Sequence, residues 1–460
     1  MPNLPTYSFV IDAAGRVSQR GVNRDLVPRG AVYMDADTAA GDIYGPFDAE
    51  SRDLIRIASA VATADRLSLR RPKGLTRLQE ELCWPRRISV TLTLESPTPW
   101  VHVTDRLADL LYFLTDDEWT FAFEAGAEAP PEPIPLFPEE ISPESEVVLF
   151  SGGLDSACGA YLRAQALAGT DRRVVAVTSF GHTVSRKRVW DVFTALGHRE
   201  TVRWCGFEHQ LKAQDADEDG SRRARGFYFL AVASALAKRI GVNRVLSFET
   251  GVGALSTPMN AAQAGAQNTR AMHPRTVAGC EAIFRETLNW PVSLEQPYFF
   301  DTKGELCKAA GSALELLALK SITCNGGGQR LPIRDAHCGL CTSCLYRRSS
   351  LHAALAGRDP TSYRSPPKNK KDRGYQLFAF ENQAVELARA SLAWPTLLAY
   401  DPNIRHAVAR FSSVQGTSPQ AVQAALCSLF RRHAAEALAY LREANPLPQD
   451  VSIMTVGASP

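Results

Sequence analysis

The sequence has almost no excess of charge of one sign: 51 lysines and arginines stand against 49 aspartates and glutamates, a net charge of +2 over 460 residues. A generally basic surface that would attract nucleic acid is therefore excluded, and we expect no nucleic acid among the partners. No uninterrupted apolar run is long enough to span a bilayer, and the first residues lack the basic, apolar and small-residue order of a secretory signal. We accordingly expect no membrane partner and a cytoplasmic location.

Cysteine is also scarce, with ten in the whole chain, so we expect no disulfide framework and a reducing compartment. The length is too great for one compact core and predicts two to four domains. With 45% hydrophobic and 22% charged residues, the composition is that of a globular protein and argues against wholesale disorder.

The strongest local pattern is an apolar, strand-forming run at 147–150 that ends in Ser-Gly-Gly and precedes a helical pattern at 157–168. Two adjacent glycines let backbone N–H groups approach a phosphate, and a helix N-terminus adds favourable partial charge. The hydroxyls are further donors, and Asp155 can hold a metal ion that bridges phosphates. No Gly-Lys-Ser/Thr follows, so this is not a Walker P-loop. An ordinary Gly-rich turn is the alternative, but we predict a phosphate site formed by Ser151, Gly152, Gly153, Leu154, Asp155 and Ser156.

The region before this motif, residues 1–143, predicts an α+β accessory domain. Alternating apolar residues indicate strands at 7–11, 87–94 and 119–123, and apolar stripes indicate helices at 50–66 and 103–114. A connector rich in proline and acidic residues at 128–144 marks its end. No chemistry is evident in this region.

Residues 144–358 alternate between strand and helix patterns, which predicts an α/β domain with a doubly wound parallel sheet. Three further strands are expected at 173–178, 200–205 and 245–248, the last closing a set of four, with helices at 185–196 and 225–240. Ligands bind such sheets at the carboxyl ends of the strands. We therefore expect the site in the segments 151–156, 179–182 and 249–253, with Ser179 and Phe180 among its residues.

Residues 359–460 predict a helical region. A loop with prolines and lysines comes first, and helical patterns follow at 383–394, 402–411 and 419–443. The last residues, 449–460, lack any periodic pattern.

A metal site is predicted by the cysteines at 324, 338, 341 and 344. Four thiolates suit tetrahedral zinc, and a set without an open position makes the metal structural. An iron–sulfur cluster also takes four cysteines, and redox thiols are a further alternative in which two of the four would be superfluous. We favour zinc bound by Cys324, Cys338, Cys341 and Cys344.

Together these motifs resemble the PP-loop ATP pyrophosphatases, and among them the 7-cyano-7-deazaguanine synthases, over residues 147–351. The family's Ser-Gly-Gly-x-Asp-Ser stands at 151–156, its arginine turn before a long helix at Arg225, its Lys-x-Glu at Lys303 and Glu305, and its zinc ligands at the four cysteines. The resemblance implies a PP-loop, adenine nucleotide alpha hydrolase-like fold with ATP, Mg²⁺ and Zn²⁺ as cofactors. It assigns catalytic roles to Asp155, Lys303 and Arg225 and places Ser179 and Phe180 in the adenosine pocket.

The sequence also departs from the plain synthases. Arg225-Gly226 stands for Arg-Asn, Thr257-Pro258-Met259 stands for Tyr-Pro-Asp, and the segment 267–275 has no obvious counterpart. The added N-terminal and C-terminal regions make the chain more similar to the QueC-like proteins of bacterial antiphage operons, in particular the QatC family of the Qat system.

That resemblance implies an ATP-dependent ligase in antiphage defence. It would adenylate the carboxylate of a 7-deazaguanine, release pyrophosphate and pass the acyl group to an amine, for instance one of a partner protein from the same operon. Two alternatives stay open: a plain 7-cyano-7-deazaguanine synthase that uses ammonia, and a non-catalytic nucleotide-binding scaffold of a defence complex. Modification of tRNA would call for a strongly basic added domain, which the charge balance does not provide.

Overall fold

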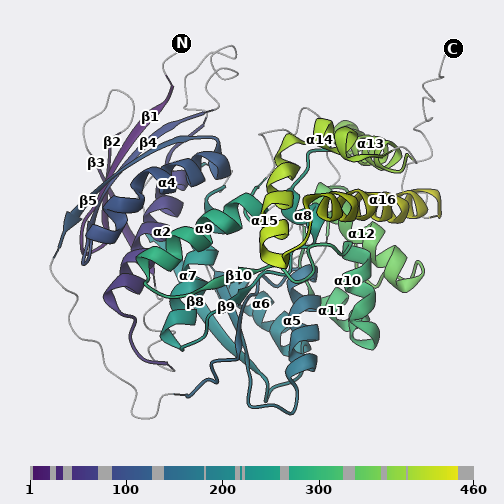
Figure 1. The fold of residues 1–460 in the computed structure, drawn as a ribbon, viewed down its shortest axis with the longest axis horizontal. Helices are drawn as coiled ribbons and strands as arrows, with labels where there is room; N and C mark the ends of the chain where they lie inside the picture. Colours follow the sequence, from purple (N-terminus) through teal and green to yellow (C-terminus); the bar gives the residue numbers. More distant parts are fainter. Residues whose placement is uncertain are drawn as a thin grey trace.

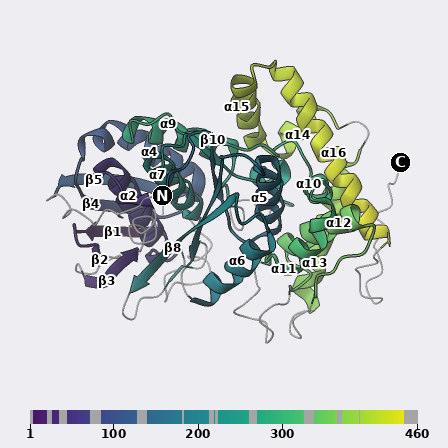
Figure 2. The same cartoon turned by 90° about the horizontal axis from the view of Figure 1, so that it is seen from below.

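The computed structural model describes residues 4–20, 27–34, 44–70, 85–126, 139–180, 183–212, 218–219, 223–259, 269–324, 337–363, 370–389 and 392–443. In this part of the chain, a parallel sheet lies between an N-terminal mixed sheet and a group of C-terminal helices (Figures 1 and 2). Most of the expected connector at 128–144, the end of the 179–182 segment and the tail at 449–460 lie outside the described residues.

Five parallel strands form the central sheet, in the spatial order β10-β9-β6-β7-β8. They are β6 (Glu146–Leu149), β7 (Val174–Phe180), β8 (Val202–Lys212), β9 (Arg244–Leu246) and β10 (Ser293–Glu295). Because the order reverses between β6 and β9, the carboxyl ends of these two strands flank a crevice. The structure confirms the α/β class and the parallel sheet.

The expectation of four strands was wrong, because β10 adds a fifth at the edge beside β9. Only one of its three residues, Leu294, is apolar, so no apolar run indicates a strand there. The third strand was expected at 200–205 but continues to Lys212, and its far end pairs with the N-terminal sheet.

Helices cover both faces of the parallel sheet. One face packs against α5 (Leu154–Leu167), α6 (Thr183–Ala195), α10 (Lys303–Ala309), α11 (Leu314–Lys320) and α12 (Thr342–Leu355). The other packs against α7 (Arg225–Arg239) and α9 (Pro274–Thr287). Alternate residues of β6 therefore point into different cores: Val147 belongs to the α7 side and Val148 to the α5 side.

The N-terminal region has the expected mixed α+β composition. Its strands lie in the order β3-β2-β1-β4-β5, and α2 (Ala49–Leu67) and α4 (Thr98–Thr115) pack on them. The strands are β1 (Thr6–Ile11), β2 (Arg16–Arg20), β3 (Val27–Met34), β4 (Arg87–Leu94) and β5 (Glu118–Ala125). The strands expected at 7–11, 87–94 and 119–123 and both expected helices are present.

The N-terminal region is joined to the parallel sheet by strand pairing and helix packing, and not only by the covalent connection of the chain. β3 pairs antiparallel with β8, so one sheet of ten strands runs through both parts. α2 packs on α7 and α4 packs on α9, and their apolar side chains share one core with the β6 to β8 face. The N-terminal region thereby covers α7, the helix that begins at Arg225.

The C-terminal region is helical, as expected, with α13 (Lys370–Leu387), α14 (Trp394–Tyr400), α15 (Arg405–Gln415) and α16 (Pro419–Glu443). The single helix expected at 383–394 was wrong: α13 ends at Leu387 and α14 begins at Trp394, with Pro395 in its first turn. Proline fits the start of a helix but interrupts its interior. Among the described helices, none has the length and apolar character needed to cross a membrane.

Candidate functional site

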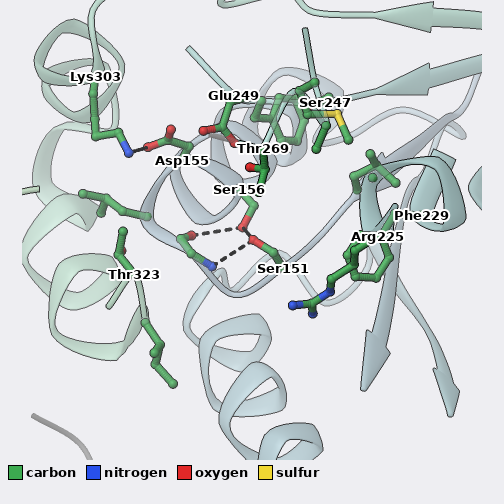
Figure 3. A pocket seen from close by; sticks show the side chains of 18 of the residues that line it. Ser151, Asp155, Ser156, Arg225, Phe229, Ser247, Glu249, Thr269, Lys303 and Thr323 are labelled. Carbon is green, nitrogen blue, oxygen red and sulfur yellow. Dashed lines mark hydrogen bonds and ion pairs between the residues drawn. The ribbon is translucent and has the colours of Figure 1, made fainter. Parts of the chain in front are cut away.

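A cavity of about 510 Å³ opens at the carboxyl ends of β6 and β9, where the strand order reverses. Polar and charged side chains from six separate chain segments converge on it (Figure 3). Those that carry the argument are Ser151, Asp155, Ser156, Arg223, Arg225, Glu249, Lys303 and Thr323. Convergent polar groups in the crevice of a parallel sheet are typical of a ligand site.

The Ser-Gly-Gly turn forms one side of this cavity. Gly152 has a φ of +73°, which a residue with a side chain rarely adopts, and it lets the chain turn from β6 directly into α5. Ser151 Oγ accepts from the N–H of Gly153 at 3.2 Å and lies 3.2 Å from Ser156 Oγ. Gly153 is the N-cap of α5, and no side chain caps this helix start. The first N–H groups of a helix point away from its N-terminus, as an anion site requires.

A lysine and two carboxylates meet at the floor of the cavity. Lys303 Nζ lies 3.0 Å from Asp155 Oδ1, and both side chains are largely buried. Burial opposes the charged form of Lys303, but the charges of Asp155 and Glu249 outweigh it and raise the pKa of the lysine. Burial, and then the negative charge of Asp155, raise the pKa of Glu249 to about 7, against the opposing effect of Lys303.

Two arginines also line the cavity. Arg225 is the first residue of α7, and its guanidinium carbon lies 4.8 Å from the centre of the Phe229 ring. Arg223 is bound to the N-terminal region through Asp116, at 2.7 Å, and through the carbonyl oxygen of Thr115. The N-terminal region thus helps to hold the turn from which α7 begins.

The second residue of the Arg225-Gly226 pair has little space for a side chain. A Cβ at Gly226 would lie 2.5 Å from the Cβ of Ala271 and 2.7 Å from its Cα. Ala271 therefore occupies the space that a side chain at position 226 would need.

A smaller cavity of about 110 Å³ adjoins the first, and Arg225 and Phe229 line both. Ser179 and Phe180, at the end of β7, line only this smaller cavity, together with residues of α2. His209 also lines it, and its Nε2 is buried without a hydrogen-bond partner among the described residues. Burial, and then the charges of Arg66 and Arg225, lower the pKa of His209 to about 4, so the imidazole is neutral at pH 7.

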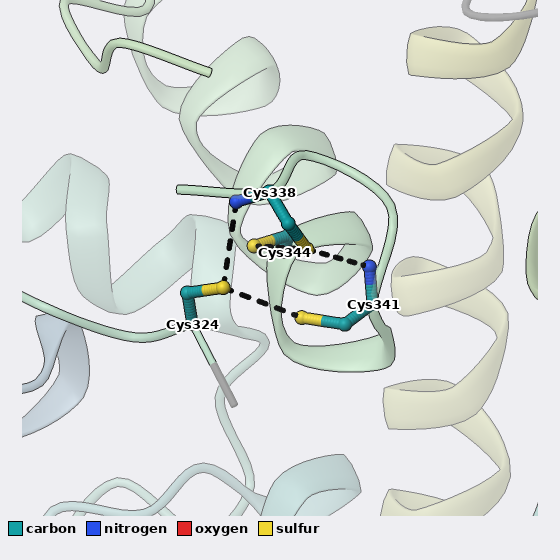
Figure 4. A group of neighbouring side chains, drawn as sticks. All are labelled: Cys324, Cys338, Cys341 and Cys344. Carbon is teal, nitrogen blue, oxygen red and sulfur yellow. Dashed lines mark hydrogen bonds between the residues drawn. The ribbon is translucent and has the colours of Figure 1, made fainter. Parts of the chain in front are cut away.

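The four cysteines form a cluster in which all Sγ atoms lie within 4.8 Å of one another (Figure 4). Two of the Sγ–Sγ distances are 3.8 Å and 3.9 Å. Thiolates bound to one tetrahedral ion at about 2.3 Å are about 3.8 Å apart, whereas a cluster of several irons needs more room. Among the described residues, this group of Cys324, Cys338, Cys341 and Cys344 is compatible with a zinc site.

The cysteine cluster is coupled to the Ser-Gly-Gly turn by the segment 321–324. The N–H of Ile322 donates to the carbonyl oxygen of Gly152 at 2.9 Å. Two residues further along, Cys324 enters the cluster, and the N–H of Thr323 donates to Nε2 of His337 at 3.2 Å. Buried Arg347 of α12 holds the same segment through Ser321 and Thr323.

Most residues predicted from the sequence converge on the two cavities. Ser151, Gly153, Leu154, Asp155, Ser156, Arg225 and Lys303 line the large one, Ser179 and Phe180 the small one, and Gly152 shapes the turn behind them. Thr257, Pro258 and Met259 do not line the large cavity; Pro258 accepts a hydrogen bond from Tyr400 of α14, and Met259 packs among the C-terminal helices.

The sequence analysis assigned no individual role to several cavity residues, among them Arg223, Glu249 and His209. Glu249 was part of the expected strand-end segment 249–253, and that position was its only signal. The roles of Arg223 and His209 depend on contacts with the N-terminal region, which no local pattern encodes.

The fold and site define an α/β protein with a polar cavity at the carboxyl edge of a parallel sheet and a four-cysteine cluster beside it. A scan of the sequence against models of protein families gives no match, and a search of curated proteins gives none.

Proposed function

We propose that this chain is an AMP-forming, ATP-dependent ligase that activates the carboxylate of a 7-deazaguanine and transfers the acyl group to an amine of a partner protein. The observation that carries the proposal is the Ser-Gly-Gly turn opening into the cavity that also holds Lys303, Asp155 and Arg225. The resemblance of the 151–156, Lys303 and cysteine motifs to the deazaguanine synthases supplies the substrate class. The same resemblance supplies the PP-loop, adenine nucleotide alpha hydrolase-like fold and antiphage defence as the setting.

In the first step, a carboxylate oxygen of the substrate attacks the α-phosphorus of ATP. The bond between that phosphorus and the oxygen bridging to the β-phosphate breaks, and pyrophosphate leaves with the electron pair. The N–H groups of the 151–156 turn and the N-terminus of α5 hold the pyrophosphate, because backbone N–H groups at the start of a helix attract an anion. Lys303 and Arg225 stabilise the charge that grows on the phosphates.

In the second step, the amine nitrogen attacks the acyl carbon, AMP leaves, and the amine loses a proton as the amide forms. When bound, a magnesium ion would neutralise part of the phosphate charge. Asp155 and Glu249 fit such an ion. Asp155 Oδ2 is buried without a hydrogen-bond partner among the described residues. The negative charge of Asp155 acts on the nearby carboxyl group of Glu249, as it would for two ligands of one cation. The four cysteines would hold a structural zinc ion.

The smaller cavity suits the adenosine end of ATP. Ser179, Phe180 and Tyr228 surround a volume about the size of a planar base, and the neutral His209 offers a hydrogen-bonding nitrogen. Arg225 lies between this cavity and the phosphate turn, as a residue that contacts the phosphates of the same nucleotide would.

The proposal is tested by incubating the protein with ATP, Mg²⁺, 7-carboxy-7-deazaguanine and candidate partner proteins. AMP is followed by chromatography, and partner proteins by intact mass. AMP formation with addition of the deazaguanine acyl mass to a partner supports the proposal. AMP with only a small-molecule amide or nitrile would identify the plain synthase, and ATP binding without AMP would identify a non-catalytic scaffold; each of these results overturns transfer to a protein.

A further inference from the structure

The long C-terminal helix α16 packs against α10, the helix that begins at cavity residue Lys303. One stripe of α16, formed by Leu429, His433 and Glu436, faces the segments that carry the site residues. Leu429 lies against Gly251 at the start of α8 (Gly251–Leu255), two residues after Glu249. His433 is buried near Lys303. Burial, and then the charge of Lys303, lower the pKa of the imidazole to about 4.

Glu436 binds the first turn of α10, the helix that begins with Lys303. The hydroxyl of Thr302, the N-cap of α10, donates to Oε1 of Glu436. The same hydroxyl accepts from the N–H of Glu305 at 3.0 Å, so one oxygen joins the cap of α10 to α16. Gly304 leaves room for the carboxyl group, since a Cβ there would lie 2.5 Å from Oε1 and 2.7 Å from Oε2.

We propose that Glu436 is a positioning residue of the active site: through Thr302 and Gly304 it fixes the first turn of α10 and so holds Lys303 against Asp155. The C-terminal helices are then part of the catalytic unit and not only an added recognition surface. Lys303 lies between the contact to Glu436 on one side and the 3.0 Å ion pair with Asp155 on the other. The catalytic consequence rests on the proposed function, whereas the effect on the position of Lys303 does not.

The electrostatic surroundings of Glu436 are mixed. Burial, and to a smaller extent the charge of Glu305, raise the pKa of Glu436 to about 7. The hydrogen bond from Thr302, the backbone of Gly304 and the charge of Arg432 act in the opposite direction. Arg432 itself bridges to Glu305 at 3.2 Å and to the carbonyl oxygen of Phe300 at 2.7 Å. A glutamine at 436 keeps the hydrogen bond to Thr302 and has no proton to lose.

The experiment compares the variants Glu436→Ala, Glu436→Gln and Gly304→Ala with Glu443→Ala, a control that removes an exposed glutamate from the end of the same helix. Alanine favours helix more than glycine does. A loss of activity in Gly304→Ala therefore reports the clash with Glu436 and not a weaker α10. Thermal unfolding of each variant confirms that it is folded.

The first readout is AMP formation. We expect Glu436→Ala and Gly304→Ala to lower kcat about 10-fold to 100-fold, as loss of alignment does, with little change in the Kd of ATP. We expect Glu436→Gln to stay close to wild type and to show a flatter rate profile around pH 7, and Glu443→Ala to behave as wild type. Full activity of Glu436→Ala beside an active wild type overturns the positioning role alone.

The second readout needs no turnover. Competitive acetylation with acetic anhydride, followed by peptide mass spectrometry, measures the reactivity of Lys303 relative to exposed Lys308 on the same helix. We expect the ratio to rise several-fold in Glu436→Ala and Gly304→Ala but not in Glu436→Gln, because the ammonium group is released from the buried ion pair. An unchanged ratio in folded Glu436→Ala overturns the inference, whether or not the wild type forms AMP. A wild type that forms no AMP counts only against the proposed function.

Discussion

Nζ of Lys303 and Oδ1 of Asp155 are 3.0 Å apart at the floor of the cavity, although they come from α10 and α5, which are distant in the sequence. Each residue occupies the first turn of its helix. The packing of α10 on α5 therefore brings a cation to the Ser-Gly-Gly turn, where the carboxylate of Asp155 balances its charge. This ion pair connects the Ser-Gly-Gly turn with the second half of the domain.

Replacing either partner of this pair should abolish most of the activity. We expect Lys303→Met and Asp155→Asn each to lower AMP formation about 10²–10³-fold, as loss of one charge-stabilising group does. The measurement is AMP and pyrophosphate release under single-turnover conditions. Lys308→Met, on the exposed side of α10, is the matched control and should retain activity. Wild-type rates in Lys303→Met would remove the lysine from the mechanism.

Gly152→Ala should weaken ATP binding, because this residue has a φ of +73° and its Cβ would lie 3.3 Å from Val189. The backbone strain costs about 1–2 kcal/mol. Gly169 provides a control, since its φ is +78° and a Cβ there would meet open space. Both variants should lose similar stability in thermal unfolding, but only Gly152→Ala should raise the Kd of ATP in calorimetry. Equal ATP affinity of the two variants would show that the turn does not bind the nucleotide.

The cysteine cluster should contain zinc, at about one equivalent per chain as expected for a four-thiolate site. Elemental analysis of the purified protein measures the metal, and the absence of a visible absorption band distinguishes zinc from an iron–sulfur cluster. Cys344→Ser should lose most of the metal. Cys427→Ser changes a buried cysteine outside the cluster and should keep it. A brown protein that contains iron would contradict the zinc assignment.

Loss of the metal should also weaken ATP binding at a distance. The N–H of Ile322 binds the carbonyl oxygen of Gly152, and Cys324 anchors the same segment in the cluster. We therefore expect Cys344→Ser to lower both the Tm and the ATP affinity, because the segment that supports the turn is released. Metal-free protein with unchanged ATP affinity would show that the two sites are independent.

The parts of the site that sequence could predict are those encoded within a few residues. The turn at 151–156 and the cysteines at 338, 341 and 344 have spacings that specify their geometry locally. The segment containing Glu249 was expected because the carboxyl ends of parallel strands share one edge. Lys303 was expected only from the resemblance, since no property of its own helix connects it with Asp155.

The parts that sequence could not predict depend on tertiary packing. β10 has a single apolar residue, Leu294, too few for a pattern. The pairing of β3 with β8 depends on which sheet edges meet. The contact of Glu436 with Thr302 joins two helices whose apolar stripes predict burial but not the partner. Arg223 and His209 acquire their surroundings from the N-terminal region in the same way.

His209 should make the protein sensitive to acid in a defined window. Its pKa is about 4 in the folded state, because of burial and the charges of Arg66 and Arg225, against an ordinary value of 6.5. As the pH falls from 6.5 towards 4, the unfolded chain takes up a proton that the folded chain does not, so stability decreases by about 1.4 kcal/mol per pH unit for this group. Above pH 6.5 the effect vanishes, since both states are neutral.

His209→Gln removes this titration and keeps a polar side chain in the smaller cavity. We expect the fall in Tm between pH 7.5 and pH 5 to be smaller in His209→Gln than in wild type. His102→Gln, which changes an exposed histidine of α4, should leave the fall in Tm unchanged. If the fall in Tm between pH 7.5 and pH 5 is the same in His209→Gln and wild type, the imidazole is not held neutral in the folded protein. ATP should protect the wild type in this window, because a base bound beside His209 stabilises the folded state in proportion to its affinity.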